Sequence, residues 1–470
     1  MNFSSRIAWV SAFFFSVALF YAPLAYGCTR PEMLPTLYGL LIIAMVIGVA
    51  SFVASGRRPA IPKALLLCAA AVLVQGWWMT WYPALPDVVA SHGGMVDVTV
   101  DNIRQVSFDS MLMTTVLLGS FLVLYGLFAE PLQRRFVLLA ATLSGVLVCL
   151  IGVILKIGGE PLMRYVWRPE DLYWNDFAFF HYHGNAGTFL ILVWPLILVF
   201  TRRAYAPRGG KFKKMVWTLF SLLCAAALIL NSSKAALVIG LLILPWPFMT
   251  WLMRLRRPNQ IFLGAVALLF ISVFLAGSTL LTREPAFQRL SHSAEVYADA
   301  QARWDDYKVD FNAVPDVGWF GLGPGLYKVA FPYQMSSMRN AGGAVHDYAH
   351  EDYLQTVLEW GYFGTFWWTF LVAGGLYRAF RTYSRRESFT SKTERHLVLA
   401  AILGVVGTLA QALLDFPLQI ASLRFFFLVL LALCWASPEC LTRRPRQSSR
   451  RRFQLVIPAE PGVEAEAGVD

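Results

Sequence analysis

Long runs of apolar residues, separated by short polar segments, dominate the pattern of this chain. A helix needs about 20 mostly apolar residues to cross the hydrocarbon core of a bilayer. About twelve runs reach that length, which predicts an all-α polytopic membrane protein. The predicted spans are 7–26, 35–54, 62–80, 109–128, 136–155, 185–201, 215–230, 235–253, 260–281, 358–379, 397–414 and 420–436.

The basic residues between these runs fall on alternate connections. Lysine and arginine concentrate in cytoplasmic loops, so this alternation predicts that both termini are cytoplasmic. The opposite, outer side then receives three loops, 81–108, 156–184 and 282–357, and two tight turns, 231–234 and 415–419. The first run begins after Arg6 and is interpreted as an uncleaved helix rather than a signal peptide, because further spans follow at once.

Composition supports a membrane protein and argues against two other classes. The chain has 470 residues, of which 57% are hydrophobic and 15% charged, whereas soluble domains carry about 25% charged residues. The net charge of +11 could indicate a nucleic-acid partner, but the basic residues lie in short segments between apolar runs. The six cysteines are scattered and indicate neither a disulfide framework nor a zinc site.

The loop 282–357 is polar and aromatic, unlike the rest of the chain. Long loops are uncommon unless they are functional or disordered, and its aromatics and spaced glycines are not typical of disorder. We expect substrate chemistry in this large, partly helical loop between spans 9 and 10. The predicted regions are N-terminal spans 1–183, a membrane core 184–281, the outer loop 282–357, C-terminal spans 358–436 and a cytoplasmic tail 437–470.

Lys234 is the first candidate for chemistry, because it lies on the side opposite the basic clusters. Asn231, Ser232 and Ser233 precede it, and a predicted helix follows directly. A lysine beside serine hydroxyls and the free N–H groups of a helix N-terminus can bind phosphate or pyrophosphate. A lysine that extends to the membrane interface would give the same pattern.

Arg303 lies in the segment 299–308 of the outer loop, which is predicted to form an amphipathic helix. Arginine is the side chain best suited to bidentate phosphate recognition. An ordinary salt bridge to the acids of the same segment is the alternative, and spacing alone favours it. Arg289 is a weaker phosphate candidate at the entry of the loop.

His350 is the best candidate for a general base, just before the span at 358–379. A neutral imidazole can accept a proton from a sugar hydroxyl near neutral pH. Glu351, Asp352 and Tyr353 could orient it or bind sugar, and a structural histidine is the alternative. His346 lies four residues earlier, so a divalent-metal site with the neighbouring acids is a further alternative, although no metal motif is matched.

Two glycine-containing segments complete the set. The turn Gly321–Gly325 contains Pro324, which argues against a nucleotide-binding loop and predicts a tight turn that approaches a packed element or a ligand. Asn185 lies at the start of a span between Gly184 and Gly187. This segment could form the outer wall of a substrate cavity, or it could serve only close helix packing.

The order of these elements resembles the O-antigen ligase/polymerase family of bacterial membrane proteins. The resemblance covers about residues 184–364 and is closest in Ala349–Gln355 and Glu359–Gly364. Two positions depart from the family pattern. Lys234 stands where the family has arginine, which keeps the charge but loses the bidentate fork. Glu351 stands where the family has asparagine, which adds a charge beside the proposed base.

The resemblance implies a GT-C-like glycosyltransferase of the bacterial inner membrane that uses no metal and no other cofactor. Its donor would be a polyprenyl-pyrophosphate-linked glycan, and its acceptor a second lipid-linked glycan, lipid A-core or a protein hydroxyl. A chain-length regulator and a flippase would be possible partners. Nothing in the sequence marks lipid A recognition, which favours a polymerase.

The resemblance also implies roles for the candidate residues. Lys234 and Arg303 would neutralise the departing pyrophosphate, and His350 would take or orient the acceptor proton. The aromatics of the loop could stack on sugar faces or anchor the protein at the interface. The expected substrate-binding residues are Arg289, Ser232, Ser233, Asn185, Trp304, Tyr353 and Glu351, with Tyr307, Trp319 and Tyr327 as further stacking candidates.

Two other classes of function are compatible with many spans. A flippase or another secondary transporter should carry ionisable residues at the bilayer midplane. Most predicted spans lack charges, and the charges concentrate in one outer loop, so a carrier is the second hypothesis. A non-catalytic scaffold is the third, and the combination of Lys234, Arg303 and His350 argues against it.

Overall fold

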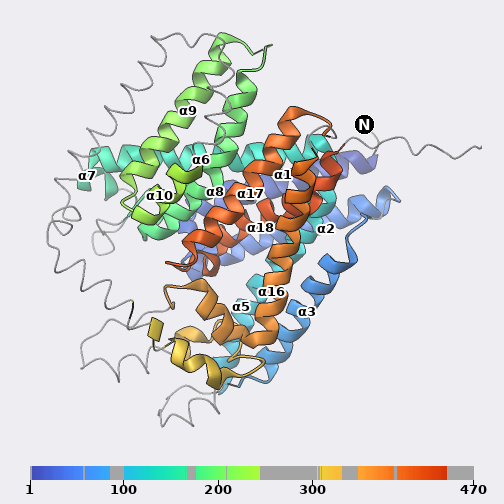
Figure 1. Ribbon diagram of the computed structural model, residues 1–470, viewed down its shortest axis with the longest axis vertical. Coiled ribbons are helices and arrows are strands. Elements are labelled where there is room, and N and C mark those ends of the chain that lie inside the picture. Colours follow the sequence, from blue (N-terminus) through green and yellow to red (C-terminus); the bar gives the residue numbers. More distant parts are fainter. Residues whose placement is uncertain are drawn as a thin grey trace, which may run out of the picture.

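The computed structural model describes residues 3–56, 59–84, 100–164, 166, 176–207, 209–243, 304, 307–308, 310–330, 348–385 and 389–441. These residues are mainly helical and contain no β-strand (Figure 1). The helices are α1 (Phe3–Leu24), α2 (Leu34–Ala54), α3 (Lys63–Trp81), α5 (Val100–Leu127), α6 (Pro131–Gly158), α7 (Glu160–Met163), α8 (His183–Ala204), α9 (Lys211–Leu230), α10 (Lys234–Ile243), α16 (Asp352–Ser384), α17 (Lys392–Gln411) and α18 (Ala421–Ala436).

Nine helices of the described ranges are long and apolar enough to cross a membrane. They correspond in order to nine of the predicted spans, which confirms a multi-pass membrane protein. Of the remaining predictions, 235–253 is described only as far as the end of α10, and 260–281 lies outside the described residues. The span at 358–379 lies within the 33-residue helix α16, which bends at Gly361. The total of about twelve spans stays a prediction.

Local sequence signals explain where several helices begin and end. Pro131 occupies the first turn of α6, where its missing N–H is not needed, and Gly159 follows the last turn with a φ of +66°. Ser391 precedes α17, and its hydroxyl accepts a hydrogen bond from the N–H of Glu394 at 3.2 Å. Such a cap satisfies one of the free N–H groups of the first turn.

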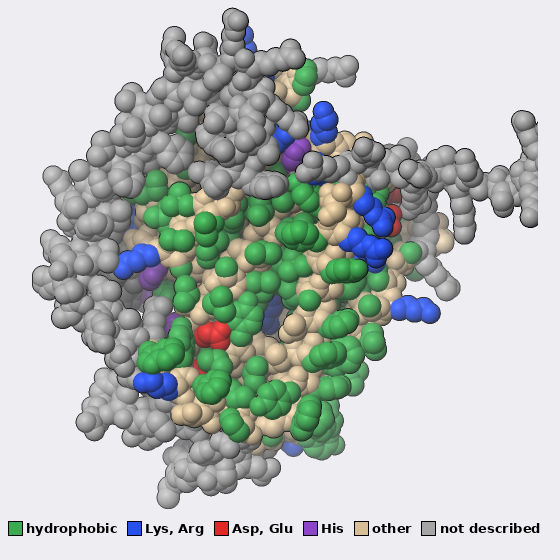
Figure 2. All heavy atoms as spheres, viewed as in Figure 1, with side chains coloured by type: hydrophobic (Ala, Val, Ile, Leu, Met, Phe, Trp, Pro, Cys, Tyr) green, Lys and Arg blue, Asp and Glu red, His purple; other side chains and the backbone are tan. Residues whose placement is uncertain are grey.

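Helices α8, α17 and α18 form the centre of the bundle (Figure 1). Among the nine apolar helices, α8 and α18 are the most enclosed and α2 and α9 the least. Exposed valines on α2, such as Val46 and Val53, fit a surface that faces lipid. Figure 2 shows hydrophobic side chains spread over one face of the bundle, with most lysines and arginines nearer its edges.

The two ends of the bundle differ in chemistry. At one end, Arg134 and Arg135 at the start of α6 hydrogen-bond to Glu394 in the first turn of α17, with Nε–O distances of 2.8 Å and 2.6 Å. At the far end of α17, the carbonyl of Ala412 accepts a hydrogen bond from the N–H of Asp352, where α16 begins. The basic pair therefore lies opposite the start of α16, as the predicted alternation of loops requires.

Candidate active site

His350 lies on the connection into α16 in a strained backbone conformation. Its φ is +56°, in the left-handed region that residues with a Cβ seldom adopt. The Tyr307 hydroxyl donates to the carbonyl oxygen of His350 at 3.0 Å. The N–H of the preceding Ala349 donates to Oε1 of Gln355 at 3.2 Å. Strain of this kind persists only where surrounding contacts hold it, and it clusters at functional sites.

Phe416, in the turn between α17 and α18, helps to orient the imidazole of His350. Its ring centroid lies 5.1 Å from that of His350 in an edge-on arrangement. The same phenyl ring stacks with Tyr348 at 4.6 Å and with Tyr182 at 5.5 Å. The rings of Phe416 and Tyr182, from two separate segments, therefore contact the candidate base, and Tyr348 packs on Phe416. Such contacts favour defined ring orientations.

The two acids after His350 hold the local structure. Glu351 is the N-cap of α16, and its carboxylate accepts hydrogen bonds from the N–H groups of Tyr353 and Leu354. Asparagine, the residue of the family pattern, is also a strong N-cap. Glu351, in place of the asparagine of the family pattern, thus still provides a side-chain acceptor at the start of the helix. The expected contact of Glu351 with substrate stays a prediction.

Asp352 joins α16 to the turn between α17 and α18. Its carboxylate accepts hydrogen bonds from the N–H of Leu418 at 2.8 Å and from Nε2 of Gln419 at 2.9 Å. Burial raises the pKa of Asp352 to about 8, although both hydrogen bonds and the charge of Arg424 act to lower it. Burial also raises the pKa of Glu351. The start of α16 therefore sits in an environment that disfavours negative charge.

The second cluster is the turn between α9 and α10. Lys234 is the first residue of α10, as predicted, and its side chain is exposed. Ser232 has a φ of +61°, and the hydroxyl of Ser233 accepts a weak hydrogen bond from the N–H of Ala236 at 3.4 Å. A helix N-terminus with a lysine at its first position is a favourable place for an anion.

Glycines let the start of α8 approach both clusters. A Cβ on Gly184 would collide with the carboxylate of Asp415 in the α17–α18 turn. A Cβ on Gly187 would lie 2.5 Å from that of Ala236 in α10. This close approach shows that the two glycines serve packing, one of the two roles that the sequence left open. It places Asn185 between the α9–α10 and α17–α18 turns, and a role in a substrate cavity stays a prediction.

Several polar atoms of this region are buried without a hydrogen-bond partner among the described residues. They are Oδ1 of Asn185, Oδ1 of Asn231 and the hydroxyl of Ser232. Buried polar groups normally find partners, so each unsatisfied one needs an explanation. The hydroxyl groups of a sugar could satisfy them.

The start of α8 connects the two clusters. Nδ2 of Asn231 donates to the carbonyl oxygen of His183 at 3.0 Å. The preceding residue, Tyr182, contacts both His350 and Phe416 with its ring. The structure therefore brings the Lys234 turn and His350 to the same end of the bundle, with Tyr182 and His183 between them.

The glycine turn of the outer loop is packed against α16, as its sequence predicted. Gly321, Gly323 and Gly325 all have positive φ values. The N–H groups of Leu322 and Gly323 donate to the carbonyls of Leu358 and Glu359, both at 2.9 Å. The Glu359 carboxylate accepts from the N–H of Gly325 at 3.0 Å. These contacts give the Glu359–Gly364 motif a structural role in docking the loop.

The aromatic candidates separate into buried and accessible groups. Tyr327 is fully buried, and its hydroxyl donates to Asp310 at 3.1 Å, so the expectation that it stacks on sugar is wrong. Trp304, Trp319 and Tyr353 expose much of their surfaces, and their predicted roles stay open. The Tyr307 hydroxyl is engaged with the His350 backbone, which gives this tyrosine a positioning role.

Other predicted residues lie outside the described residues. Arg289 and Arg303 are among them, as are His346 and Asp347 of the alternative metal site. The predicted helix 299–308 is described only in part, and Trp304, Tyr307 and Lys308 are helical. The positions of the two arginines relative to Lys234 therefore remain predictions.

Sequence reasoning missed Asp415, Phe416 and Arg424. The sequence predicts 415–419 only as a short turn between spans, because an aromatic residue near a membrane boundary is common and does not by itself indicate a site. Arg424 did leave a signal, since an arginine in an apolar span is rare and usually has a function. Its relation to Asp352 could not be read from the chain.

The fold and the site together define a multi-pass helical membrane protein with a polar, histidine-containing site at one end of the bundle. Residues 219–369 match the family model described as O-antigen ligase. This match confirms the predicted family resemblance and broadly supports a ligase- or polymerase-type function on lipid-linked glycans. The matched stretch includes Lys234, Arg303 and His350. A search of curated proteins found no match.

Proposed function

We propose that the protein is a membrane glycosyltransferase that transfers or polymerises a polyprenyl-pyrophosphate-linked glycan on the periplasmic face of the inner membrane. The observation that carries this proposal is the convergence of His350 and the Lys234 turn at one end of the bundle. Both lie inside the stretch that matches the O-antigen ligase family.

The chemistry follows from the bonds that change. The acceptor hydroxyl oxygen forms a bond to the anomeric carbon, and the bond between that carbon and the pyrophosphate oxygen breaks. The acceptor proton passes to the imidazole of His350, and the pyrophosphate leaves with the lipid. A positioned base typically contributes about 10²–10⁴-fold to such a step.

Lys234 is proposed to stabilise the charge that grows on the leaving group. Its position at the first residue of α10 adds the N-terminal N–H groups and helix dipole to its own charge. Arg303 and Arg289 are proposed to complete the anion site from the outer loop. Fixed cations of this kind supply charge neutralisation, so the reaction is proposed to need no metal.

The glycan is proposed to bind beside the start of α8. Buried acceptor atoms of Asn185 and Asn231 and the hydroxyl of Ser232 are suited to sugar hydroxyls. Ser233 and Glu351 line the same end of the bundle, and Trp304 and Tyr353 offer accessible rings. The acceptor is proposed to be a second lipid-linked glycan, with lipid A-core as the alternative.

The test uses the purified full-length protein in detergent with a lipid-linked glycan donor, an acceptor and a chelator. Wild-type protein should form elongated or transferred product. His350→Ala should still bind donor but should lose about 10²–10⁴-fold in rate. His350→Gln should retain part of the rate, because an amide can orient the hydroxyl without taking its proton.

Lys234 supplies the second arm of this test. Lys234→Ala should slow transfer by about 2–4 kcal/mol of transition-state stabilisation, whereas Lys234→Arg should remain active. Full activity of folded Lys234→Ala would remove this lysine from the mechanism. Movement of lipid-linked glycan across vesicles, without covalent product from any acceptor, would instead identify a flippase or another transporter.

A further inference from the structure

A cavity of about 260 Å³ lies between α16, α17 and α18. Its walls are mostly apolar and include Trp368, Val372, Leu376 and Leu428. Two wall threonines, Thr356 and Thr365, use their hydroxyls to donate to carbonyls of their own helix at 2.6 Å and 2.7 Å. The cavity therefore presents mainly hydrocarbon surface to an occupant.

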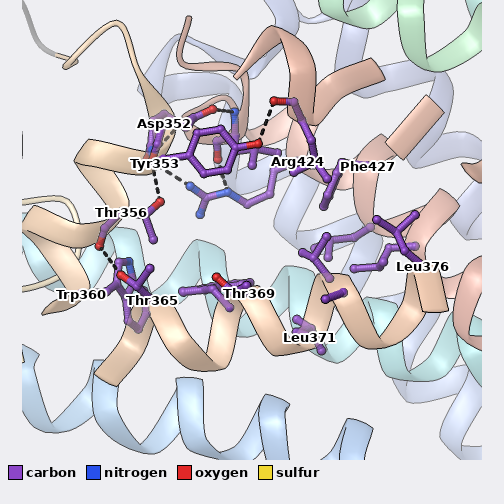
Figure 3. Close-up of a pocket in the computed structure, with 18 residues that line it drawn as sticks. Asp352, Tyr353, Thr356, Trp360, Thr365, Thr369, Leu371, Leu376, Arg424 and Phe427 are labelled. Carbon is purple, nitrogen blue, oxygen red and sulfur yellow. Dashed lines mark hydrogen bonds between the residues drawn. The ribbon is translucent and has the colours of Figure 1, made fainter. Parts of the chain in front are cut away.

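One end of the cavity is polar. Figure 3 shows Asp352 and Tyr353 together near Arg424, while Leu371 and Leu376 lie farther along α16. Asp352 follows the candidate base His350 by two residues. The polar end of the cavity therefore lies within two residues of the candidate base along the chain, although His350 itself does not line it.

Arg424 is the charged group at this end. It lies in the first turn of α18, where the helix dipole disfavours a cation. Its guanidinium donates to the carbonyl of Leu418, to Oε1 of Gln419 at 3.2 Å and to the hydroxyl of Thr114 at 3.5 Å. None of these partners within the described residues is a carboxylate, and three hydrogen bonds leave other guanidinium N–H groups available.

Asp352 does not pair with Arg424 directly. Gln419 bridges the two, because it accepts from Arg424 and donates to Asp352. Asp352 and Glu359 act on this partly buried cation only through space, since neither carboxylate is in hydrogen-bond contact with it. Its remaining N–H groups can therefore still bind a further anion. A phosphate is the anion whose geometry best matches a guanidinium.

The cavity also has access from the side. Thr369 and Ala373 line it and are exposed on the surface of α16. The lining residues of α16 beyond the Gly361 bend run from Thr365 to Leu376, which corresponds to about 16 Å at about 1.5 Å per residue. That length covers about half of the hydrocarbon core of a bilayer, so the cavity can hold the first part of a long lipid chain.

We propose that this cavity binds the polyprenyl chain of the lipid-linked donor and that Arg424 contacts its phosphate. This inference rests on the proposed function. Of the two lipid-linked substrates, only the donor has its reacting carbon bonded to the lipid pyrophosphate. A donor must therefore place its lipid pyrophosphate next to His350 when it reacts. An acceptor reacts through the sugar at the far end of its glycan, so its lipid head would lie away from His350.

The binding experiment uses purified full-length protein with undecaprenyl pyrophosphate as the probe, measured by native mass spectrometry and titration. Ala373→Trp should fill the cavity and weaken binding by about tenfold or more, since a tenfold change is only about 1.4 kcal/mol. Phe370→Trp is the matched control, because Phe370 is exposed on α16 and does not line the cavity. This control should bind as wild type.

Arg424→Gln tests the phosphate contact, with uncharged undecaprenol as a second probe. This variant should weaken the binding of undecaprenyl pyrophosphate by about tenfold and leave the binding of undecaprenol unchanged. Ala373→Trp should weaken the binding of both lipids. Unchanged pyrophosphate binding in folded Ala373→Trp would overturn the proposal. Equal competition by phosphatidylglycerol would also overturn it, because the cavity would then hold only bulk lipid.

The outcomes separate this inference from the proposed function. If Ala373→Trp transfers glycan and binds donor normally, the cavity assignment fails while the transferase stands. If wild-type protein transfers no glycan but still binds undecaprenyl pyrophosphate in the cavity, the proposed transferase fails. If Ala373→Trp weakens the binding of the acceptor but not of the donor, the cavity holds the acceptor lipid. That result would contradict the donor assignment.

Discussion

At the residue scale, the central feature is that His350 is held from several sides. Its φ of +56° is unfavourable for a residue with a Cβ, yet the hydroxyl of Tyr307 binds its carbonyl and Phe416 contacts its ring. The backbone and the imidazole are therefore positioned by groups that are distant in the chain. Preorganisation of this kind reduces the reorganisation that a catalytic group needs.

Phe416→Leu should lower kcat by about tenfold or more while donor affinity changes little, because a misplaced base impairs the chemical step rather than binding. Phe416→Tyr should restore most of the rate, since it keeps the ring. Transfer kinetics at varied donor concentration measure the two parameters. A rise in KM without loss of kcat would show that Phe416 binds substrate instead of positioning His350.

At the element scale, the outer segment 310–330 is attached to the bend of α16 by backbone contacts. Gly321 has a φ of +79°, and a Cβ there would meet the backbone of Glu359 and Gly361. Gly361 itself has a φ of +63° and approaches the carbonyl of Trp319. The bend in α16 and the glycine turn therefore require each other.

Gly321→Ala should destabilise the protein by more than the roughly 1 kcal/mol expected from a positive φ alone, because it also creates a backbone clash. Gly318→Ala is the matched control, since Gly318 has a φ of +61° but open space where its Cβ would lie. Thermal melting of the purified variants compares the two. Equal melting temperatures would show that the contact between the turn and the bend contributes no stability.

The attachment of α16 to the α17–α18 turn should depend on pH through Asp352. Burial raises the pKa of this carboxyl from 3.8 to about 8, so the folded protein holds a proton that the unfolded chain releases above about pH 4. The free energy of unfolding should therefore fall as pH rises between these values. Melting temperatures at pH 5.5 and 8.5 should show a smaller difference in Asp352→Asn than in wild type, and identical differences would contradict the prediction.

At the scale of the whole molecule, the bundle places its polar clusters at opposite ends. The Arg134–Glu394 contact lies at one end, and the His350 and Lys234 clusters lie at the other. This separation agrees with the predicted sides of the loops. The predicted topology puts the His350 and Lys234 end on the periplasmic side, where we propose that substrate chemistry occurs.

Cysteine labelling in intact cells tests that orientation. Cysteines introduced at Ser293 and Ser336 should react with a membrane-impermeant reagent, whereas Ala206→Cys, in the predicted cytoplasmic connection between α8 and α9, should react only after the inner membrane is opened. The six native cysteines are buried, so background labelling should be low. The reverse pattern would invert the topology.

Hydropathy alone determined most of the fold, because the length and apolarity of a span are local properties of the chain. The same holds for the start of α10 at Lys234 and for the glycine turn at 321–325, whose residues signal their backbone conformation. Motif order also predicted the family resemblance that the match over residues 219–369 supports, and it selected the candidate base, whose role stays a prediction. These features depend on neighbours in sequence rather than on neighbours in space.

Packing alone decided the surroundings of the site. Tyr327 and Trp319 look alike as aromatic candidates, yet one is fully buried and the other exposed, because burial depends on which helix covers a ring. Phe416 meets His350, and Gln419 links Asp352 to Arg424, only after α16, α17 and α18 come together. Contacts between residues distant in sequence follow from the three-dimensional arrangement of helices, which no local pattern contains.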